Sequence, residues 1–437
     1  MLNAPVPGIL GAKMMHDFGV SPTHTIIMDL PLSLDPVNQM KGLPPVAFDS
    51  TKPSRFGVFP RRSPEKVRWF ETDASCIFHT ANSWDTVSPS TGKTTSVNML
   101  ACRLTSATMV FAAGNIAPPV HAPPPSVTAA RKKSRMPFFS KYNAATDGSS
   151  YETSPLLESP SEEKEPAITV SAIEPPTDEE DEIEDFLFEE DQCRLYYYNF
   201  DLHTGQIAHQ WALSAIPFEF PSVRPGLEMQ DARYVYGCST TTTSFGSALG
   251  KATKIDALVK ADVATLIARG QARPPRSVSG IVDQRTMAQV LGEGQGEGET
   301  ISVFTMPEGW FAQEPRFVAK RPTAEDPKPA EDDGFLLFYA FDEAQLDLAT
   351  GDLPADDGEG RAKSELWIID AKTMKDIICR VHLPQRVPYG LHGSWFDAKQ
   401  IAEQKPVEKV RSTVKATGGK TTGVWMSVRD AVEKMLG

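Results

Sequence analysis

The chain has 437 residues, of which 40% are hydrophobic and 23% charged, and this composition is typical of globular proteins. Lysine and arginine number 44 against 57 aspartate and glutamate residues, so the formal net charge is −13. This excess of acid argues against a nucleic-acid-binding protein, which needs a basic face to neutralise phosphates. The length suits about three average domains or one large repeat fold.

Five scattered cysteines without a CxxC pair argue against both a disulfide framework and a zinc cluster. The N-terminus, MLNAPVPGILGAKMMHDFG, lacks the charged and apolar regions of a secretory leader. No stretch reaches the roughly 18 apolar residues that a membrane-spanning helix needs. We therefore expect a cytoplasmic protein, and we leave open peripheral contact with a membrane surface.

Residues 20–112 contain short runs of β-type residues separated by Pro, Gly, Asp and Ser clusters: THTIIMDLPLSL, KVRWFE, CIFHTANSW and SVNMLACRLT. This spacing is typical of an all-β sandwich, barrel or propeller. Residues 115–191 differ, since they pass from PPVHAPPP through RKKSR to a Ser/Glu/Pro stretch that ends in PTDEEDEIEDFLFEED. Such a segment cannot bury enough apolar surface to fold alone, so we expect a disordered insertion.

Strands resume at Cys193, where CRLYYYNFDLHTGQIAHQWAL predicts two strands joined at residues 201–205. Gly205 would supply the positive φ of a bulged hairpin. ELWIIDAKTMKDIICRVHLP, residues 365–384, predicts a second hairpin, and RYVYGCST, ETISVFTMP and FLLFYAFDE predict further strands. Repeated hairpins without βαβ alternation favour a β-propeller or a large barrel.

Two segments have helical spacing. Residues 251–270, KATKIDALVKADVATLIARG, are compatible with a helix or with a strand followed by a loop. In the polar C-terminal tail, VWMSVRDAVEKML has its apolar residues on one helical face. Because the opposite face is not notably basic, this tail favours a terminal helix docked on the protein over a membrane anchor.

The short motifs of nucleotide, acyl and zinc chemistry are absent: there is no Walker loop, GxGxxG, GxSxG or HExxH. Five of the eight histidines lie in turns, polar strands or the insertion, where a solvated or structural role is the default. These five are His24, His121, His203, His209 and His382. The other three, His16, His79 and His392, have apolar or aromatic neighbours in or beside predicted strands. Nothing local forces these three together, so spacing alone favours hydrogen-bonded histidines over a shared metal site.

Nine segments, however, follow one another in the order of a known family: MMHDFGVSPTHTIIMDLPL, RFGVFPRR, RWFETDASCIFHTANSWD, EFPSVRPGL, ARYVYG, QEPRFVAKRP, EDDGFLLFYAFDE, SELWIIDAKTM and RVHLPQRVPYGLHGSWF. Together they resemble the carotenoid cleavage oxygenase family, and closely its plant-type epoxycarotenoid dioxygenase and apocarotenoid-cleaving branches. They cover most of residues 4–115 and 193–396. The HDF, FHxxN and VPYGxHG elements are specific when they occur together.

The resemblance implies an all-β, seven-bladed β-propeller that holds iron (Fe2+) on its axis with four histidines and three outer glutamates. His16, His79 and His392 match the second, third and fourth iron ligands, and Glu219 and Glu314 match two of the glutamates. Carboxylates bonded to the outer ring N–H groups would orient neutral imidazoles and offset the metal charge. Taken alone, a strand-end glutamate is usually a solvated surface residue.

The family's first histidine and first glutamate match nothing in this chain, so we expect an N-terminally incomplete propeller. On this basis the chain divides into four parts. Residues 1–114 would form the first blades, residues 115–191 the insertion, residues 192–396 the second set of blades, and residues 397–437 a polar tail with a short terminal helix.

The implied reaction is cleavage of a conjugated double bond of a carotenoid or apocarotenoid by O2 into two carbonyl products. The substrate would be an apolar polyene in an apolar tunnel. Phe18, Phe78, Trp84 and Trp395 adjoin the ligand positions and could line this tunnel, although core packing is the commoner role of such residues. Two alternatives stay open: a catalytically inactive propeller remnant that binds a lipid or a protein partner, and a stilbene-cleaving dioxygenase.

Overall fold

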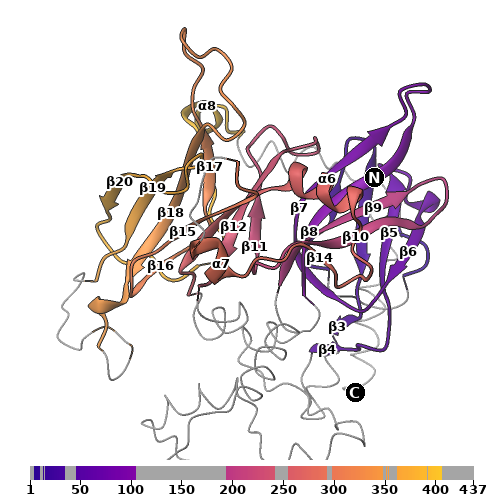
Figure 1. The fold of residues 1–437 in the computed structure, drawn as a ribbon, viewed down its shortest axis with the longest axis horizontal. Helices are drawn as coiled ribbons and strands as arrows, with labels where there is room; N and C mark the ends of the chain where they lie inside the picture. Colours follow the sequence, from indigo (N-terminus) through magenta and orange to yellow (C-terminus); the bar gives the residue numbers. More distant parts are fainter. Residues whose placement is uncertain are drawn as a thin grey trace, which may run out of the picture. The chain divides into compact units, whose positions relative to one another are not determined.

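The computed structural model describes residues 4–9, 13, 15–34, 46–104, 193–241, 254–292, 298–347, 351, 353, 362–390 and 392–405. The chain divides into two compact units, Met1–Gly393 and Ser394–Gly437. All described strands belong to the first unit, and they pair antiparallel except for one parallel pair (Figure 1). The described part of the second unit contains helix α8 (Ala398–Ala402), which Asp397 and Gln400 cap reciprocally.

The first sheet follows directly after the segment that contains His16. Its strands lie in the order β1 (Gly19–Val20), β2 (His24–Asp29), β5 (Ser54–Pro60) and β6 (Arg68–Thr72). A 3-10 helix, η1 (Pro64–Lys66), joins β5 to β6. Two short strands, β3 (Leu32–Leu34) and β4 (Val46–Phe48), form a separate pair.

The second sheet has the order β14 (Ile281–Asp283), β10 (Ile207–Ser214), β9 (Arg194–Asp201), β8 (Thr94–Leu104) and β7 (Cys76–Val87). The predicted hairpin of β9 and β10 is confirmed, with φ +74° at Gly205 and a register shift after Ile207. Side chains of β8 and β9 alternate between two core clusters, because successive residues of a strand face opposite sides of its sheet. Leu100 and Tyr197 belong to the larger cluster, and Met99 and Tyr198 to the smaller one. This sheet is therefore buried on both faces.

The third sheet has the order β11 (Glu219–Ser222), β12 (Tyr234–Ser239), β13 (Ala257–Asp262) and β15 (Ile301–Thr305). Helices α6 (Val263–Ala272) and α7 (Met287–Gly292) lie between β13 and β15 in the chain. Residues 251–270 were expected to form either one helix or a strand with a loop, and both alternatives are wrong in part. Asp262 ends β13 and caps α6, since its carboxylate accepts from the Thr265 amide at 3.0 Å, so a strand passes directly into a helix.

The fourth sheet has the order β16 (Trp310–Ala312), β18 (Gly334–Asp342), β19 (Glu365–Asp370) and β20 (Ile377–His382), and β17 (Arg316–Ala319) also pairs with β18. A 3-10 helix, η3 (Glu343–Gln345), follows β18. The predicted hairpin of residues 365–384 is confirmed as β19 and β20.

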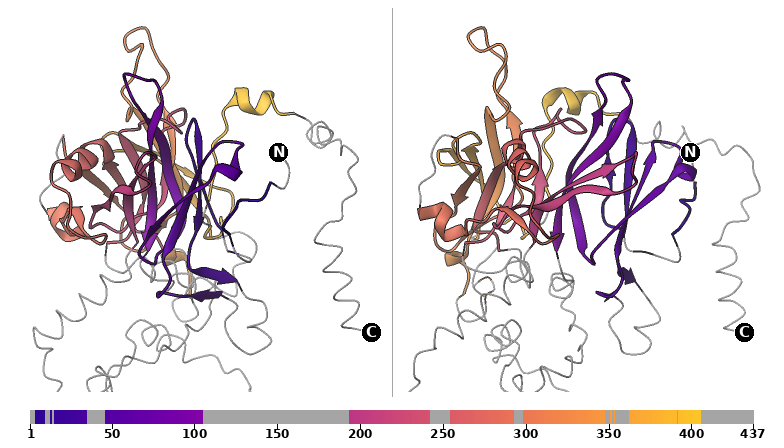
Figure 2. Two further views of the ribbon diagram at one scale, coloured as in Figure 1. Left: turned by 90° about the vertical axis from the view of Figure 1, so that its right-hand side faces the viewer. Right: turned by 45° about the vertical axis from the view of Figure 1, so that its right-hand side comes forward.

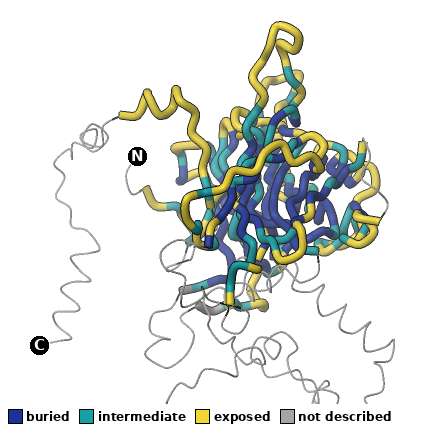
Figure 3. The backbone as a smooth tube through the Cα atoms, turned by 90° about the vertical axis from the view of Figure 1, so that its left-hand side faces the viewer, coloured by how far each residue is buried: buried dark blue, intermediate teal, exposed yellow. Residues whose placement is uncertain are grey.

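The first and third sheets both contact the second sheet around β7. Strand β1 of the first sheet lies beside β7, and β11 of the third sheet lies beside both β7 and β8. Figure 2 shows the ribbon from two further directions, and Figure 3 colours the backbone by burial. Strands β9 and β13 are largely buried, whereas β20 is exposed over its whole length. The prediction of a fold made mostly of strands is confirmed.

The part of the chain that the structure describes contains only three α-helices, of 5 to 10 residues. The predicted insertion, residues 115–191, and the predicted helix near the C-terminus lie outside the described residues.

Candidate metal centre

The histidine nearest the N-terminus, His16, lies in the segment before β1 and is held against β7. The neighbouring Asp17 carboxylate accepts hydrogen bonds from the Thr80 amide at 2.7 Å and from the Thr80 hydroxyl at 2.8 Å. His16 Nδ1 lies 2.9 Å from the Phe78 carbonyl oxygen. A carbonyl can only accept, so Nδ1 carries the proton and Nε2 keeps its lone pair.

His79 lies in the middle of β7, where the strand is irregular. The pairing of β7 with β8 shifts register between Ile77 and Thr80 and again between Thr80 and Asn82. Such irregularities re-aim side chains and are common beside functional sites. His79 Nδ1 lies 2.6 Å from Glu219 Oε2, whereas the buried His79 Nε2 has no hydrogen-bond partner.

Glu219 is the first residue of β11, and its carboxylate is fully buried. Besides His79, the Phe220 amide donates to Oε2 at 2.7 Å, and the Cys193 thiol donates to Oε1 at 3.6 Å. Burial raises the pKa of the Cys193 thiol well above its usual range, with further contributions from Cys102 and Glu219, so the thiol is a neutral donor. Glu219 therefore has several donors, but its neighbours Phe220 and Cys193 carry no charge.

The environment of His79 raises the pKa of its imidazole. Burial alone would lower the pKa of His79, but the hydrogen bond and charge of Glu219, with smaller contributions from Asp17 and Glu314, outweigh it and raise the pKa. The same negative field would favour any cation at the free Nε2.

His392 lies in the irregular segment after β20, and its side chain is 46% exposed. Its Nδ1 lies 3.2 Å from Oε2 of the buried Glu314. The Gly393 amide donates to the same oxygen at 3.3 Å, and Arg316 Nη2 donates to it at 2.9 Å.

The structure brings the three histidine rings together from distant parts of the chain. The ring centroids of His16 and His79 are 5.0 Å apart, and those of His79 and His392 are 5.1 Å apart. The ring of Phe220 lies 5.2 Å from His79 and 5.6 Å from His392. Phe220 has a positive φ of 52°, a strained conformation that commonly occurs at functional sites.

Each of the three imidazoles thus uses Nδ1 to bind an oxygen acceptor, which leaves Nε2 as the atom able to bind a metal. This is the usual arrangement of metal-binding histidines. As they stand, however, no group of three His, Cys, Asp or Glu side chains among the described residues could hold a metal ion. The rings are neighbours without forming a complete set of ligands.

The four aromatic residues expected to line a tunnel lie in different surroundings. Phe78 is partly buried, and its ring meets the His16 ring edge-on at 5.4 Å. Phe18 is 54% exposed. Trp84 is buried in the larger core cluster, where it stacks on Tyr197. Trp395 is exposed and belongs to the second unit.

The residues that sequence reasoning missed are those that support the histidines: Asp17, Cys193, Phe220 and Arg316. Asp17 directly follows His16 in HDF, and Phe220 directly follows Glu219 in EFP. Arg316 lies two positions after Glu314 in EPR. That proximity was the available signal. Cys193 lies 26 residues before Glu219, and no local pattern connects the two.

Of the other histidines, four lie where a structural or solvated role was expected. His24 bonds the Thr23 hydroxyl, His203 is exposed in the turn after β9, His209 packs on Tyr197 and Trp211, and His382 pairs with Glu365. His121 lies outside the described residues.

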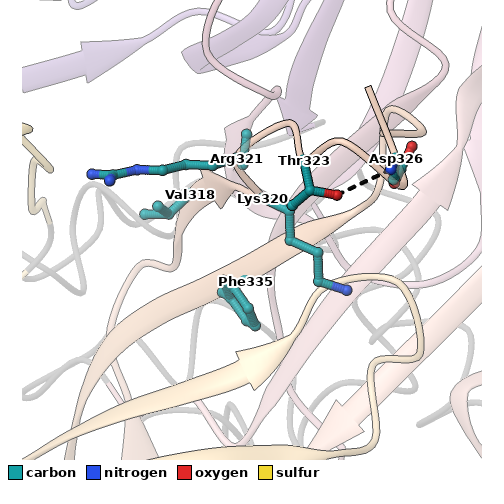
Figure 4. A pocket seen from close by; sticks show the side chains of 7 residues that line it. Val318, Lys320, Arg321, Thr323, Asp326 and Phe335 are labelled. Carbon is teal, nitrogen blue, oxygen red and sulfur yellow. Dashed lines mark hydrogen bonds between the residues drawn. The ribbon is translucent and has the colours of Figure 1, made fainter. Parts of the chain in front are cut away.

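A hollow of about 500 Å³ lies along β17 and the segment that follows it, and Lys320, Arg321, Thr323, Asp326 and Phe335 contribute to its lining (Figure 4). None of the predicted site residues lines it. Among the described residues, no helix has the length and apolar character needed to cross a membrane.

Comparison with known proteins connects this geometry to one family. The family model described as "Retinal pigment epithelial membrane protein" (RPE65) matches residues 2–162 and 146–397. The carotenoid dioxygenase carX of Gibberella fujikuroi is 50% identical over an alignment of 449 positions, which covers 100% of this chain and 60% of the relative. A carotenoid 9,10(9′,10′)-cleavage dioxygenase of Crocus sativus is 27% identical over 410 residues, 93% of this chain and 52% of the relative.

Solved structures agree in fold. The cobalt-substituted apocarotenoid oxygenase (ACO) of Synechocystis matches 89% of this chain and 54% of its own, with a TM-score of 0.50 and 19% identity. A chimera of ACO and RPE65 matches with the same TM-score and identity over 88% and 53%. The chain spans between half and two thirds of the length of these relatives.

Proposed function

Since this chain belongs to the carotenoid cleavage oxygenase family, we propose that it is a non-haem iron dioxygenase that cleaves a carotenoid or an apocarotenoid. The observation that carries the proposal is the state of His79. Its Nδ1 is bound to a buried carboxylate and its Nε2 is buried without a partner, beside two further imidazoles. A buried polar nitrogen without a partner is costly unless a ligand satisfies it.

In this proposal His16, His79 and His392 bind Fe2+ through Nε2. Glu219 and Glu314 accept the Nδ1 protons of His79 and His392, so they hold both rings in the required tautomer and supply negative charge near the metal. The carbonyl of Phe78 does the same for His16 without a charge. Neutral imidazoles suit iron, and carboxylates outside the ligand set leave coordination positions free.

Iron would supply the activation of O2 and the oxidation of the double bond to two carbonyl groups. The chain's own residues orient the ligands and keep their Nδ1 protons in place. The scheme requires no acid or base from the protein. Selectivity then depends on which double bond the protein places beside the metal.

The substrate in this proposal is an apolar polyene. The relatives' names specify carotenoids, and a polyene needs an apolar passage to the histidines. Phe18, Phe78 and Trp84 are our proposed tunnel residues in the first unit, and Phe78 has the most direct support because its ring touches that of His16. Peripheral contact with a membrane, where such substrates dissolve, belongs to the same proposal.

We also infer that the sheets belong to a seven-bladed β-propeller. Four sheets of four or five strands follow one another, largely in chain order, as the blades of a propeller do. The three histidines come from the segment before β1, from β7 and from the segment after β20, as expected if they lie near a common axis.

The rival function is a catalytically inactive protein that binds a lipid or a protein partner. It is favoured by the absence of a complete group of three metal ligands among the described residues. A stilbene-cleaving dioxygenase is a second rival, which only substrate tests can separate from the main proposal.

The test combines metal binding with turnover. Metal-free protein is titrated with Fe2+ without oxygen, and O2 uptake and carbonyl products are then measured with a carotenoid, an apocarotenal and a stilbene. We expect one iron per chain and aldehyde products from the polyenes. His79→Ala should abolish both, whereas His203→Ala, an exposed histidine in the turn after β9, should leave both unchanged.

Folded protein that binds no iron and forms no product would establish the inactive alternative for this chain. Cleavage of the stilbene alone would replace the proposed substrate class. Iron binding that survives His79→Ala would show that the metal lies elsewhere.

A further inference from the structure

Arg316, the first residue of β17, connects two parts of the candidate site. Its Nη2 donates to Glu314 Oε2 at 2.9 Å, and its Nε donates to the Gly393 carbonyl oxygen. Glu314 accepts from His392, and Gly393 is the next residue after His392. One guanidinium therefore holds both the acceptor of the His392 ring and the backbone that carries that ring.

The segment around His392 needs such a restraint. Residues 383–390 and 392–397 belong to no strand or helix, and the His392 side chain is 46% exposed. Ser364 and Glu343 hold its first part, through the Val387 amide and the Tyr389 hydroxyl, both at 2.8 Å. Nearer the ring, Gln313 donates to the Pro388 carbonyl at 2.9 Å, and Glu314 accepts from the Gly393 amide at 3.3 Å. An imidazole on an irregular segment must be fixed by its neighbours to within a fraction of an ångström if it is to bind a metal.

Electrostatics alone does not explain a cation at this position. Among the described residues, Glu219 forms hydrogen bonds with His79, Phe220 and Cys193, none of which is an arginine or a lysine. Glu314, by contrast, lies 2.9 Å from the Arg316 guanidinium. A positive charge beside a metal-binding histidine opposes cation binding. The planar fork of arginine can instead hold two acceptors in a fixed relationship.

We propose that Arg316 is a positioning residue that locks His392 in place through Glu314 and the Gly393 carbonyl. The inference rests on the proposed function, in which His392 is an iron ligand. It extends that function by assigning a specific task to a residue that touches neither metal nor substrate.

The first experiment needs no metal. Hydrogen exchange followed by mass spectrometry is measured for residues 387–393 in metal-free wild type and in Arg316→Gln. We expect exchange in the variant to be at least about tenfold faster, which corresponds to roughly 1.4 kcal/mol of lost local stability. Arg321→Gln is the matched control, because Arg321 is an exposed arginine just after the same strand, for which the described residues show no ion pair (Figure 4).

The second experiment asks whether Arg316→Gln weakens or strengthens Co2+ binding, because the two explanations predict opposite changes. If Arg316 acts by positioning, Arg316→Gln weakens Co2+ binding by about 10–100-fold, the usual effect of losing a residue that orients a ligand. If it acts only through its charge, the same substitution strengthens binding. Arg316→Lys keeps the charge but lacks the fork, so it should bind Co2+ less tightly than wild type.

The outcomes separate the two proposals. Unchanged exchange of residues 387–393 in Arg316→Gln, or tighter Co2+ binding, overturns the role of Arg316. Wild type that binds neither Co2+ nor Fe2+ overturns the proposed function, while the exchange measurement still decides whether Arg316 holds the segment.

Discussion

His79 and Glu219 are 140 residues apart in the chain, yet His79 Nδ1 and Glu219 Oε2 lie 2.6 Å apart. This contact joins the middle of β7 in the second sheet to the start of β11 in the third. Both partners are largely buried, with side-chain exposures of 16% and 0%. A carboxylate without solvent is costly unless strong donors surround it, so the pair connects the packing of two sheets to the polarity of the candidate metal centre.

The charge of Glu219 should matter more than its shape. Glu219→Gln keeps a carbonyl that can accept from His79 but removes the negative charge. We expect the dissociation constant for Co2+ to rise about 10–100-fold, as when other partners of metal-binding histidines are removed. Titration of metal-free protein with Co2+, followed by visible absorption, measures this constant.

The control for that substitution is Glu308→Gln, at an exposed glutamate in the turn before β16. Its Co2+ affinity should match that of wild type. Equal affinities for Glu219→Gln and wild type would mean that Glu219 only fills space in the core.

Phe218 and the Glu219 backbone lie so close to Gly237 in β12 that a side chain does not fit there. A Cβ at this position would lie 2.3 Å from Phe218 Cε1 and 2.8 Å from the Glu219 carbonyl oxygen. Backbone cannot yield cheaply, so Gly237→Ala should destabilise the protein by about 1–3 kcal/mol. Urea unfolding at neutral pH measures the change.

Gly292 at the end of α7 is the comparison, since a Cβ there meets nothing within 4 Å. Gly292→Ala should be neutral or stabilise by up to about 1 kcal/mol. If both glycine variants unfold at the same urea concentration as wild type, the close packing around Glu219 is not as the structure has it.

Much of the fold could be predicted because strand patterns are local. The hairpins of β9 with β10 and of β19 with β20 follow from runs of apolar residues separated by turn residues, with Gly205 at positive φ. Residues 251–270 were harder, because apolar spacing does not show where a strand becomes a helix. The deciding feature is a tertiary one, in which Asp262 both pairs with Arg233 and caps α6.

The candidate site could be located only through the resemblance to a family. The three histidines have no common local pattern, and tertiary contacts of β7 and of two irregular segments bring their rings together. The residues around them depend on tertiary contacts that no spacing reveals. Cys193, the residue before β9, donates to Glu219 at the start of β11. Phe220 has a positive φ, and its ring contacts two histidines that are distant in the chain.

The Phe220 ring should contribute strongly to stability and to the arrangement of the histidines. It is 3% exposed and packs against both His79 and His392. Phe220→Ala should cost about 3–5 kcal/mol, the range for buried phenylalanines, and should weaken Co2+ binding as well. Phe396→Ala, at an exposed position in the second unit, should cost less than about 0.5 kcal/mol. A small and equal cost for both variants in urea unfolding would contradict the packing of Phe220.

Asp262 should make stability depend on pH in a predictable direction. Its carboxylate accepts from Arg233 at 2.8 and 3.0 Å and from the Thr265 amide at 3.0 Å. Burial alone would raise the pKa of Asp262, but these hydrogen bonds and the charge of Arg233 outweigh it and lower the pKa. The folded state therefore binds a proton less readily than the unfolded state, whose aspartate pKa is about 3.9. This contribution to stability is fully present above that value and is lost as the pH falls through the lower, folded pKa.

Asp262→Asn tests this linkage, because asparagine retains helix-capping ability but cannot form the ion pair. At pH 7 the variant should be less stable than wild type by about 1–2 kcal/mol. The difference should narrow below about pH 4, as the wild-type carboxylate takes up its proton. Urea unfolding between pH 7 and pH 3 measures it, with Asp73→Asn, at an exposed aspartate between β6 and β7, as the control. A difference that stays constant over this range would show that the contacts of Asp262 stabilise the protein without its charge.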